Sequence, residues 1–77
     1  MVTVKLFGLV SLDSGILSMQ VEARSVREVI EKVASTGKAD KIALRKSTIF
    51  VDGKRAMPGT KIRDGHEVVF FSPAGGG

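Results

Sequence analysis

Hydrophobic and polar residues alternate near the start of the chain, which is the pattern of half-buried β-strands. The first alternating run extends from Val2 to about Leu9 and places its aliphatic residues on one face and Phe7 on the other. A second alternating run covers residues 16–21, and the segment between the two runs ends in the turn-forming Gly15. We therefore expect these two runs to form an antiparallel hairpin.

The next segment carries the signals of an amphipathic helix. Ser25 is a favourable N-cap, and Glu28 three residues later completes a capping box. Gly37 is a natural residue for ending the helix. Apolar residues recur at helical spacing and form one stripe: Val26, Val29, Ile30 and Val33. The spacing predicts a helix over residues 26–35 that packs one side on a sheet.

The second half of the chain contains shorter strand signals. Residues 38–47 are polar and basic, and we expect either a helical turn or an irregular connection there. Residues 48–51, with the sequence TIFV, predict a short strand that ends at the turn pair Asp52-Gly53. A brief returning segment follows, and a final strand is expected from His66 to about Phe71.

The order of these elements predicts an α+β fold of the β-grasp (ubiquitin-like) type. It consists of a mixed sheet of four or five strands with one main helix packed on one face. The helix after the hairpin supplies the crossover that places the last strand beside the first. We expect this domain to cover residues 1–71 and a flexible glycine-rich tail to cover residues 72–77.

The final strand has two faces of different character. Because Glu67 is expected to face water, Val68 and Phe70 should enter the core. Val69 and Phe71 then lie on the open face of the sheet, and Phe7 should lie near them. Such an exposed apolar patch commonly marks a partner surface. A shift of one residue would reverse the two faces, which is the alternative.

Composition limits the chemistry that the chain can perform. The 77 residues are 43% hydrophobic, enough for one small domain but not for a deep catalytic cavity. The chain has no cysteine, which excludes disulfides and thiolate metal sites and fits a cytoplasmic protein. His66 is the only histidine, so we expect no metal site and interpret His66 as a surface residue. No apolar run approaches the roughly 20 residues of a membrane-spanning helix.

The formal net charge of +4 raises the question of nucleic-acid binding. The densest basic stretch comprises Lys38, Lys41, Arg45 and Lys46, and Asp40 interrupts it. Only four aromatic residues, all Phe, are available for stacking on bases. We therefore favour a solvated face over docking to an acidic protein, and favour both over nucleic-acid binding.

The last three residues are all glycine. Because glycine carries no side chain, such a tail can thread a narrow channel and present a terminal carboxylate to another protein. The alternative is a frayed end with no role.

Residues 64–77, with the sequence DGHEVVFFSPAGGG, resemble the C-terminus of the small subunit of molybdopterin synthase. That family typically ends in D-G-D-E-V-A, two hydrophobic residues, P-P-V, Ser or Ala, and G-G. The body of the chain is also similar to the thiamine-pathway sulfur carrier. Two departures are Ser72, where the family often has proline, and a third terminal glycine.

The resemblance implies a carrier protein rather than an enzyme. A ubiquitin-activating-type enzyme would adenylate Gly77 with ATP, and sulfur would then replace AMP to leave a thiocarboxylate. The carrier itself would bind no cofactor. Its sulfur would pass to the large subunit of molybdopterin synthase or to another sulfur acceptor. Gly76 would accompany Gly77 at the reacting end, and five residues would contact the partners: Phe7, Val69, Phe71, Pro73 and Gly75.

Other functions fit the same sequence. The carrier could serve thiamine synthesis or tRNA thiolation. The chain could instead be a protein modifier that is conjugated to lysines through Gly77. A third possibility is a module that binds nucleic acid or acidic ligands, in which the tail is incidental.

Overall fold

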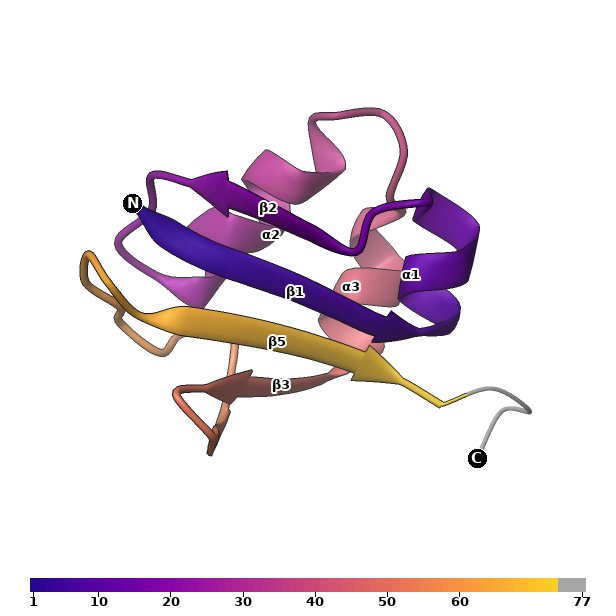
Figure 1. Cartoon of the computed structure of the whole chain (residues 1–77). Coiled ribbons are helices and arrows are strands. Elements are labelled where there is room, and N and C mark those ends of the chain that lie inside the picture. The colour runs from indigo at the N-terminus through magenta and orange to yellow at the C-terminus, as the bar shows by residue number, and fades with distance from the viewer. Residues whose placement is uncertain (74–77) are drawn as a thin grey trace.

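Five strands form one mixed sheet, and the helices α2 and α3 lie on one of its faces (Figure 1). The structure is a computed structural model that describes residues 1–73. In chain order the elements are β1 (Val2–Gly8), α1 (Leu9–Ser14), β2 (Ser18–Val21), α2 (Val26–Ala34), α3 (Lys41–Lys46), β3 (Thr48–Val51), β4 (Lys54–Ala56) and β5 (Glu67–Ser72).

The strand order across the sheet is β2-β1-β5-β3-β4. β1 and β5 are parallel, and every other neighbouring pair is antiparallel. The last strand therefore lies beside the first, which confirms the predicted β-grasp arrangement. Within residues 1–73 no helix covers the second face of the sheet, so residues of β1, β3 and β5 that point there are available to a partner (Figure 1).

The predicted hairpin is confirmed, but its connection is more ordered than expected. Gly8, rather than Leu9, ends β1, and the turn region contains the short helix α1. The Ser14 hydroxyl donates to the Val10 carbonyl at 2.6 Å, and Gly15 in the left-handed region ends the helix. Val10 is buried, so packing in the core stabilises this short helix in addition to its own hydrogen bonds.

The main helix follows the sequence signals closely. The Glu28 amide donates to the Ser25 hydroxyl at 3.2 Å, as in a capping box. The Glu28 carboxylate, however, accepts from the Arg24 amide at 2.9 Å, one residue before the N-cap. All four residues of the predicted stripe are buried, which accounts for the stability of so short a helix.

The segment for which we expect a turn or an irregular connection contains the helix α3. The Asp40 side chain caps it by accepting from the Ala43 amide at 3.1 Å. Leu44 is fully buried, and an ion pair between Lys41 and Glu31 joins α3 to α2. The segment thus closes the core against the sheet instead of crossing the surface as a loop.

Candidate functional site

The centre of the candidate site is the end of β5, where the glycine-rich segment begins. β5 ends at Ser72 between its neighbours β1 and β3, and the next residue, Pro73, is exposed. Figure 1 shows this end of β5 on the same side of the molecule as α1. The three predicted tail residues, Gly75, Gly76 and Gly77, lie outside the described residues.

Gly8 packs directly against the root of the tail. It lies opposite Ser72 in the parallel ladder and has φ 78° and ψ −143°. A Cβ atom at this position would lie 1.9 Å from the Ser72 carbonyl oxygen, so only glycine fits. The sequence analysis did not identify Gly8 as a site residue, because its role depends on the register of β1 against β5.

An exposed apolar patch surrounds this end of the sheet, as the alternation of the final strand predicts. Val68 and Phe70 are fully buried, which confirms the expected faces of β5. Phe71 is 41% exposed and lies opposite Phe7, which is 50% exposed. Val69 shares their face and is partly buried. The structure therefore brings together the three predicted apolar contact residues.

Phe50 belongs to the same patch, although the sequence analysis did not assign it there. It lies opposite Val69 in the antiparallel pair of β3 and β5 and is partly buried, while its neighbour Ile49 points into the core. Alternation along residues 48–51 could have separated these two residues, but only the pairing with β5 shows that Phe50 joins the patch. We define the open-face patch by its four members: Phe7, Phe50, Val69 and Phe71.

Polar residues border the open-face patch at the far end of β5. Lys5 and Glu67 form an ion pair of 3.1 Å, and both side chains are more than two-fifths exposed. His66 lies beside this end, where its Nδ1 atom accepts from the Arg63 amide at 3.2 Å. The hydrogen bond stabilises the turn, and the side chain, which is 34% exposed, lies at the surface as expected.

The basic stretch is partly used by the structure itself. Lys41 pairs with Glu31, and Arg45 and Lys46 lie in the last turn of α3, where positive charge favours a helix. This arrangement agrees with a solvated face. Within residues 1–73, no three acidic or histidine side chains gather as metal ligands would, and no helix is long and apolar enough to cross a membrane.

The sequence matches the ThiS family over residues 4–77. No curated protein matches the chain. SAMP1 of Haloferax volcanii has a similar structure, with a TM-score of 0.75 at 20% identity over 99% of this chain and 98% of that chain. The Amycolatopsis orientalis BexX/CysO complex contains a chain with a TM-score of 0.75 at 19% identity over 100% of both chains. A Pyrococcus furiosus protein described as molybdopterin converting factor, subunit 1, has a TM-score of 0.70 at 20% identity over 95% of this chain and 97% of that chain.

Proposed function

We propose, since the chain belongs to the ThiS family of ubiquitin-like sulfur carriers, that it carries sulfur as a thiocarboxylate on Gly77 and delivers it in molybdopterin biosynthesis. The observation that carries the proposal is the open-face patch beside the strand end from which the glycine-rich segment continues. The patch offers a docking surface, and the segment offers a narrow reactive end.

The carboxylate must first be activated. A C-terminal carboxylate has a pKa of about 3.3–3.7, so at neutral pH it is an anion and a poor acyl electrophile. An adenylating enzyme joins the Gly77 carboxylate to the α-phosphate of ATP, and pyrophosphate leaves. Hydrosulfide then attacks the acyl carbon, the bond to AMP breaks, a proton is released, and a thiocarboxylate remains on Gly77.

The length and composition of the C-terminal segment support delivery into another protein. The five residues that follow β5, from Pro73 to Gly77, could span up to about 18 Å when fully extended. Pro73 restricts its own φ angle and disfavours a helical conformation at Ser72, so the segment starts in an extended direction. Phe7 and Phe71 can therefore remain docked on a partner while Gly77 reaches into its active site. In this proposal the partners perform the catalysis and use the ATP, in the cytoplasm.

The assignment to molybdopterin rests on the approach to the tail. The run FFSP at residues 70–73 resembles the proline-containing approach of the small subunit of molybdopterin synthase. A protein described as molybdopterin converting factor, subunit 1, also shares the fold. The acceptor in this proposal is the large subunit of molybdopterin synthase. An acceptor in thiamine synthesis or tRNA thiolation would use the same activated glycine.

A second candidate function is protein modification through Gly77. One structural neighbour is the small archaeal modifier protein 1 of Haloferax volcanii, with a TM-score of 0.74. The activated glycine that accepts sulfur could equally accept a lysine amine. Adducts in cell extracts that disappear on deletion of Gly76 and Gly77 would favour this function over sulfur delivery.

Reconstitution tests the sulfur-carrier proposal. The protein, an activating enzyme of the ubiquitin-activating type, ATP and sulfide should together give a product whose mass rises by the difference between sulfur and oxygen. The variant without Gly76 and Gly77 should give no product. An unchanged mass of the wild-type protein, with an enzyme that is active on its own carrier, would contradict the proposal.

A pair of surface variants tests the docking surface. Phe7→Arg places a charge in the open-face patch and should lower the apparent affinity for the activating enzyme about tenfold or more, the loss expected of a central apolar contact. Ile42→Arg is the matched control, because Ile42 is 61% exposed on α3, on the face of the sheet that carries the helices. Equal apparent affinities of the two variants for the activating enzyme would show that the patch does not dock.

A further inference from the structure

The two edges of the sheet differ in how they are protected against pairing with another strand. The edge strand β4 has only three residues, and two of them, Lys54 and Arg55, are charged. Short, charged edge strands resist the addition of a further strand. The opposite edge strand, β2, has the sequence SMQV and is preceded by Ile16 and Leu17. Residues 16–21 contain no charge, proline or glycine, so this edge lacks the charged side chains that protect β4.

The register of β2 shows which of its backbone groups are free to pair. The Leu6 amide donates to the Leu17 carbonyl, so these two residues form a hydrogen-bonded pair. Hydrogen-bonded and non-hydrogen-bonded pairs alternate along an antiparallel ladder. Ser18, opposite Lys5, is therefore in a non-hydrogen-bonded pair, and so is Gln20. Their amides and carbonyls point away from β1, toward the outside of the sheet.

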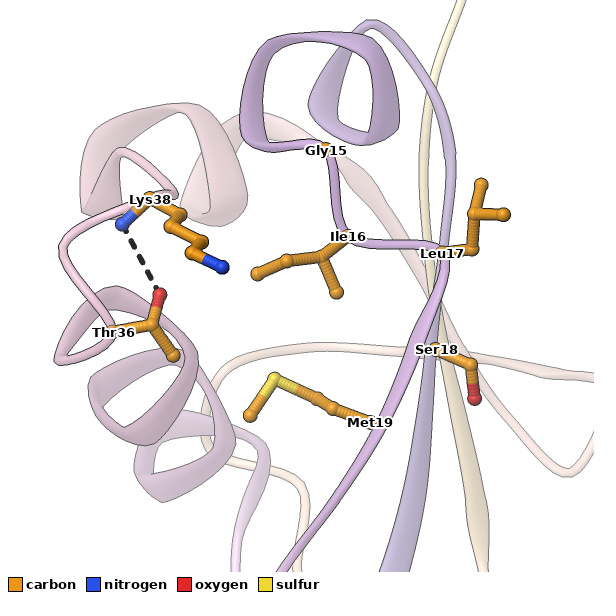
Figure 2. A pocket seen from close by; sticks show the side chains of 7 residues that line it. All are labelled: Gly15, Ile16, Leu17, Ser18, Met19, Thr36 and Lys38. Atoms are coloured by element: carbon orange, nitrogen blue, oxygen red, sulfur yellow. Dashed lines mark hydrogen bonds between the residues drawn. The ribbon is translucent and has the colours of Figure 1, made fainter.

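A groove lies beside this edge, between the start of β2 and the segment that follows α2 (Figure 2). It has a volume of about 540 Å³ and is lined by seven residues: Gly15, Ile16, Leu17, Ser18, Met19, Thr36 and Lys38. Figure 2 shows that Ile16 and Met19 point toward Thr36 and Lys38, while Leu17 and Ser18 point the other way. The side chains of Ile16 and Met19, which are only partly buried, thus form an apolar wall that a partner could cover.

Lys38 gives the groove a charge preference. Its side chain lies opposite Ile16 across the groove (Figure 2), and none of the lining residues is acidic. Among the described residues, no carboxylate lies within ion-pair distance of Lys38. A carboxylate brought in by a partner would therefore meet a cation that has no competing ion pair in residues 1–73.

We propose that the β2 edge is a second docking site, which binds an extended, acidic-apolar segment of a partner protein by strand addition. The added strand runs antiparallel to β2 and pairs with the outward backbone groups of Ser18 and Gln20. Alternate aliphatic side chains of the segment cover Ile16 and Met19. A carboxylate near the C-terminal end of the segment then reaches Lys38, because that end lies beside the start of β2.

The dimensions favour a short segment over a second copy of the chain. Four residues of strand extend about 13 Å, and the spacing of packed sheets, about 10 Å, sets the depth of the surface along one edge. The strip of surface that two β2 strands could cover is therefore small against the roughly 1,200 Å² of a stable protein interface. A flexible segment needs no further surface, since backbone hydrogen bonds and two or three side-chain contacts suffice for a weak, specific complex.

The site is separate from the sulfur-transfer site. The groove lies on the face of the sheet that carries the helices, whereas Phe7 and Phe71 lie on the open face. A partner could therefore hold the carrier at β2 while a second protein acts on Gly77. Loss of binding at β2 should leave thiocarboxylate formation unchanged, so the two proposals fail independently.

A peptide titration followed by NMR tests the proposal. The probe is the acetylated, amidated peptide Thr-Val-Thr-Ile-Thr-Asp, in which Val, Ile and Asp share one face. Added to the ¹⁵N-labelled full chain, it should shift the amide signals of Ser18, Gln20 and Lys38. The same peptide with Lys in place of Asp should bind about two- to fivefold more weakly at low salt, in line with the loss of one exposed ion pair.

Two variants at one position separate strand addition from nonspecific contact. Ser18→Pro removes an amide that points outward and should weaken peptide binding about tenfold or more, while the β1–β2 ladder keeps its hydrogen bonds. Ser18→Ala keeps the amide and should bind as the wild type does. Lys38→Glu should reverse the preference between the Asp and Lys peptides. This surface variant tests the proposal even if Ser18→Pro is poorly folded.

Four results would overturn the proposal. They are equal binding by the two Ser18 variants, peptide-induced shifts confined to Phe7 and Phe71, no shift at millimolar peptide, and shifts of β2 signals that depend on protein concentration without peptide. The last result would identify a second copy of the chain as the occupant.

Discussion

Replacement of Gly8 by alanine should destabilise the fold and displace the root of the tail. The new Cβ atom would lie 1.9 Å from the Ser72 carbonyl oxygen and 2.7 Å from its carbonyl carbon, both backbone atoms of β5. The backbone of Gly8, with φ 78° and ψ −143°, lies outside the left-handed helical region, in an area that residues with a side chain rarely adopt, and this adds about 1–3 kcal/mol. Overpacking of this kind typically costs a further 1–3 kcal/mol. We expect a total loss of about 3 kcal/mol in the free energy of unfolding, a large fraction of the roughly 4–12 kcal/mol typical of this chain length.

Gly15→Ala provides the matched control. Gly15 also has a positive φ, but with φ 74° and ψ 6° it lies in the milder left-handed region, and an added Cβ there would have no atom within 4 Å. This variant should lose about 1 kcal/mol or less, because the reduced entropy of the unfolded chain offsets part of the strain.

Thermal unfolding followed by circular dichroism measures both variants. At roughly 4–8 °C per kcal/mol, the melting temperature should fall by about 12–24 °C for Gly8→Ala and by at most about 8 °C for Gly15→Ala. At a temperature where both variants are folded, only Gly8→Ala should form thiocarboxylate more slowly than the wild type. Equal losses of stability in the two variants would refute the close approach of Gly8 to Ser72. A normal rate of thiocarboxylate formation by Gly8→Ala would show that this contact does not affect the tail.

Three further variants test other parts of the fold. Ser25→Ala removes the N-cap that accepts from the Glu28 amide and should cost about 1 kcal/mol in urea unfolding, whereas no loss would show that the cap is not used. Leu44→Ala opens a cavity at a fully buried position and should cost about 2–5 kcal/mol, whereas a loss under about 1 kcal/mol would place α3 outside the core. The hydrogen bond and charge of the Met1 ammonium lower the pKa of Asp64, so this contact stabilises the fold above the pKa of the unfolded chain and is lost as pH falls through the lower folded pKa. Asp64→Asn should therefore make the free energy of unfolding fall less steeply as the pH is lowered. An unchanged pH dependence would show that the contact does not persist in solution.

The main helix and the two faces of β5 could be predicted because their signals are local. Ser25 and Glu28 mark the start of α2 within four residues, and the buried stripe follows the helical period. Alternation, together with the expectation that Glu67 faces water, separates Phe70, which is buried, from Phe71, which is exposed. In each case the signal lies within a few neighbouring residues.

The features that the sequence analysis missed depend on contacts between distant segments. The helix α1 follows the unusual backbone conformation of Gly8 and buries Val10. The sequence pattern there predicts a strand followed by a turn and indicates neither feature. Phe50 joins the open-face patch only because β3 pairs with β5 in one register. The role of Gly8 likewise requires Ser72 to lie opposite it, 64 positions later in the chain. Pairing between strands far apart in sequence is therefore what sequence patterns could not supply.

The most direct test of the sulfur-carrier proposal is the intact mass of the protein isolated from its native host, followed by fragmentation of its C-terminal peptide. We predict a fraction of molecules in which one oxygen of the Gly77 carboxylate is replaced by sulfur, and this fraction should disappear when the activating enzyme is deleted. A native protein that carries only an unmodified carboxylate, in cells that are actively making the sulfur-containing product, would contradict the account.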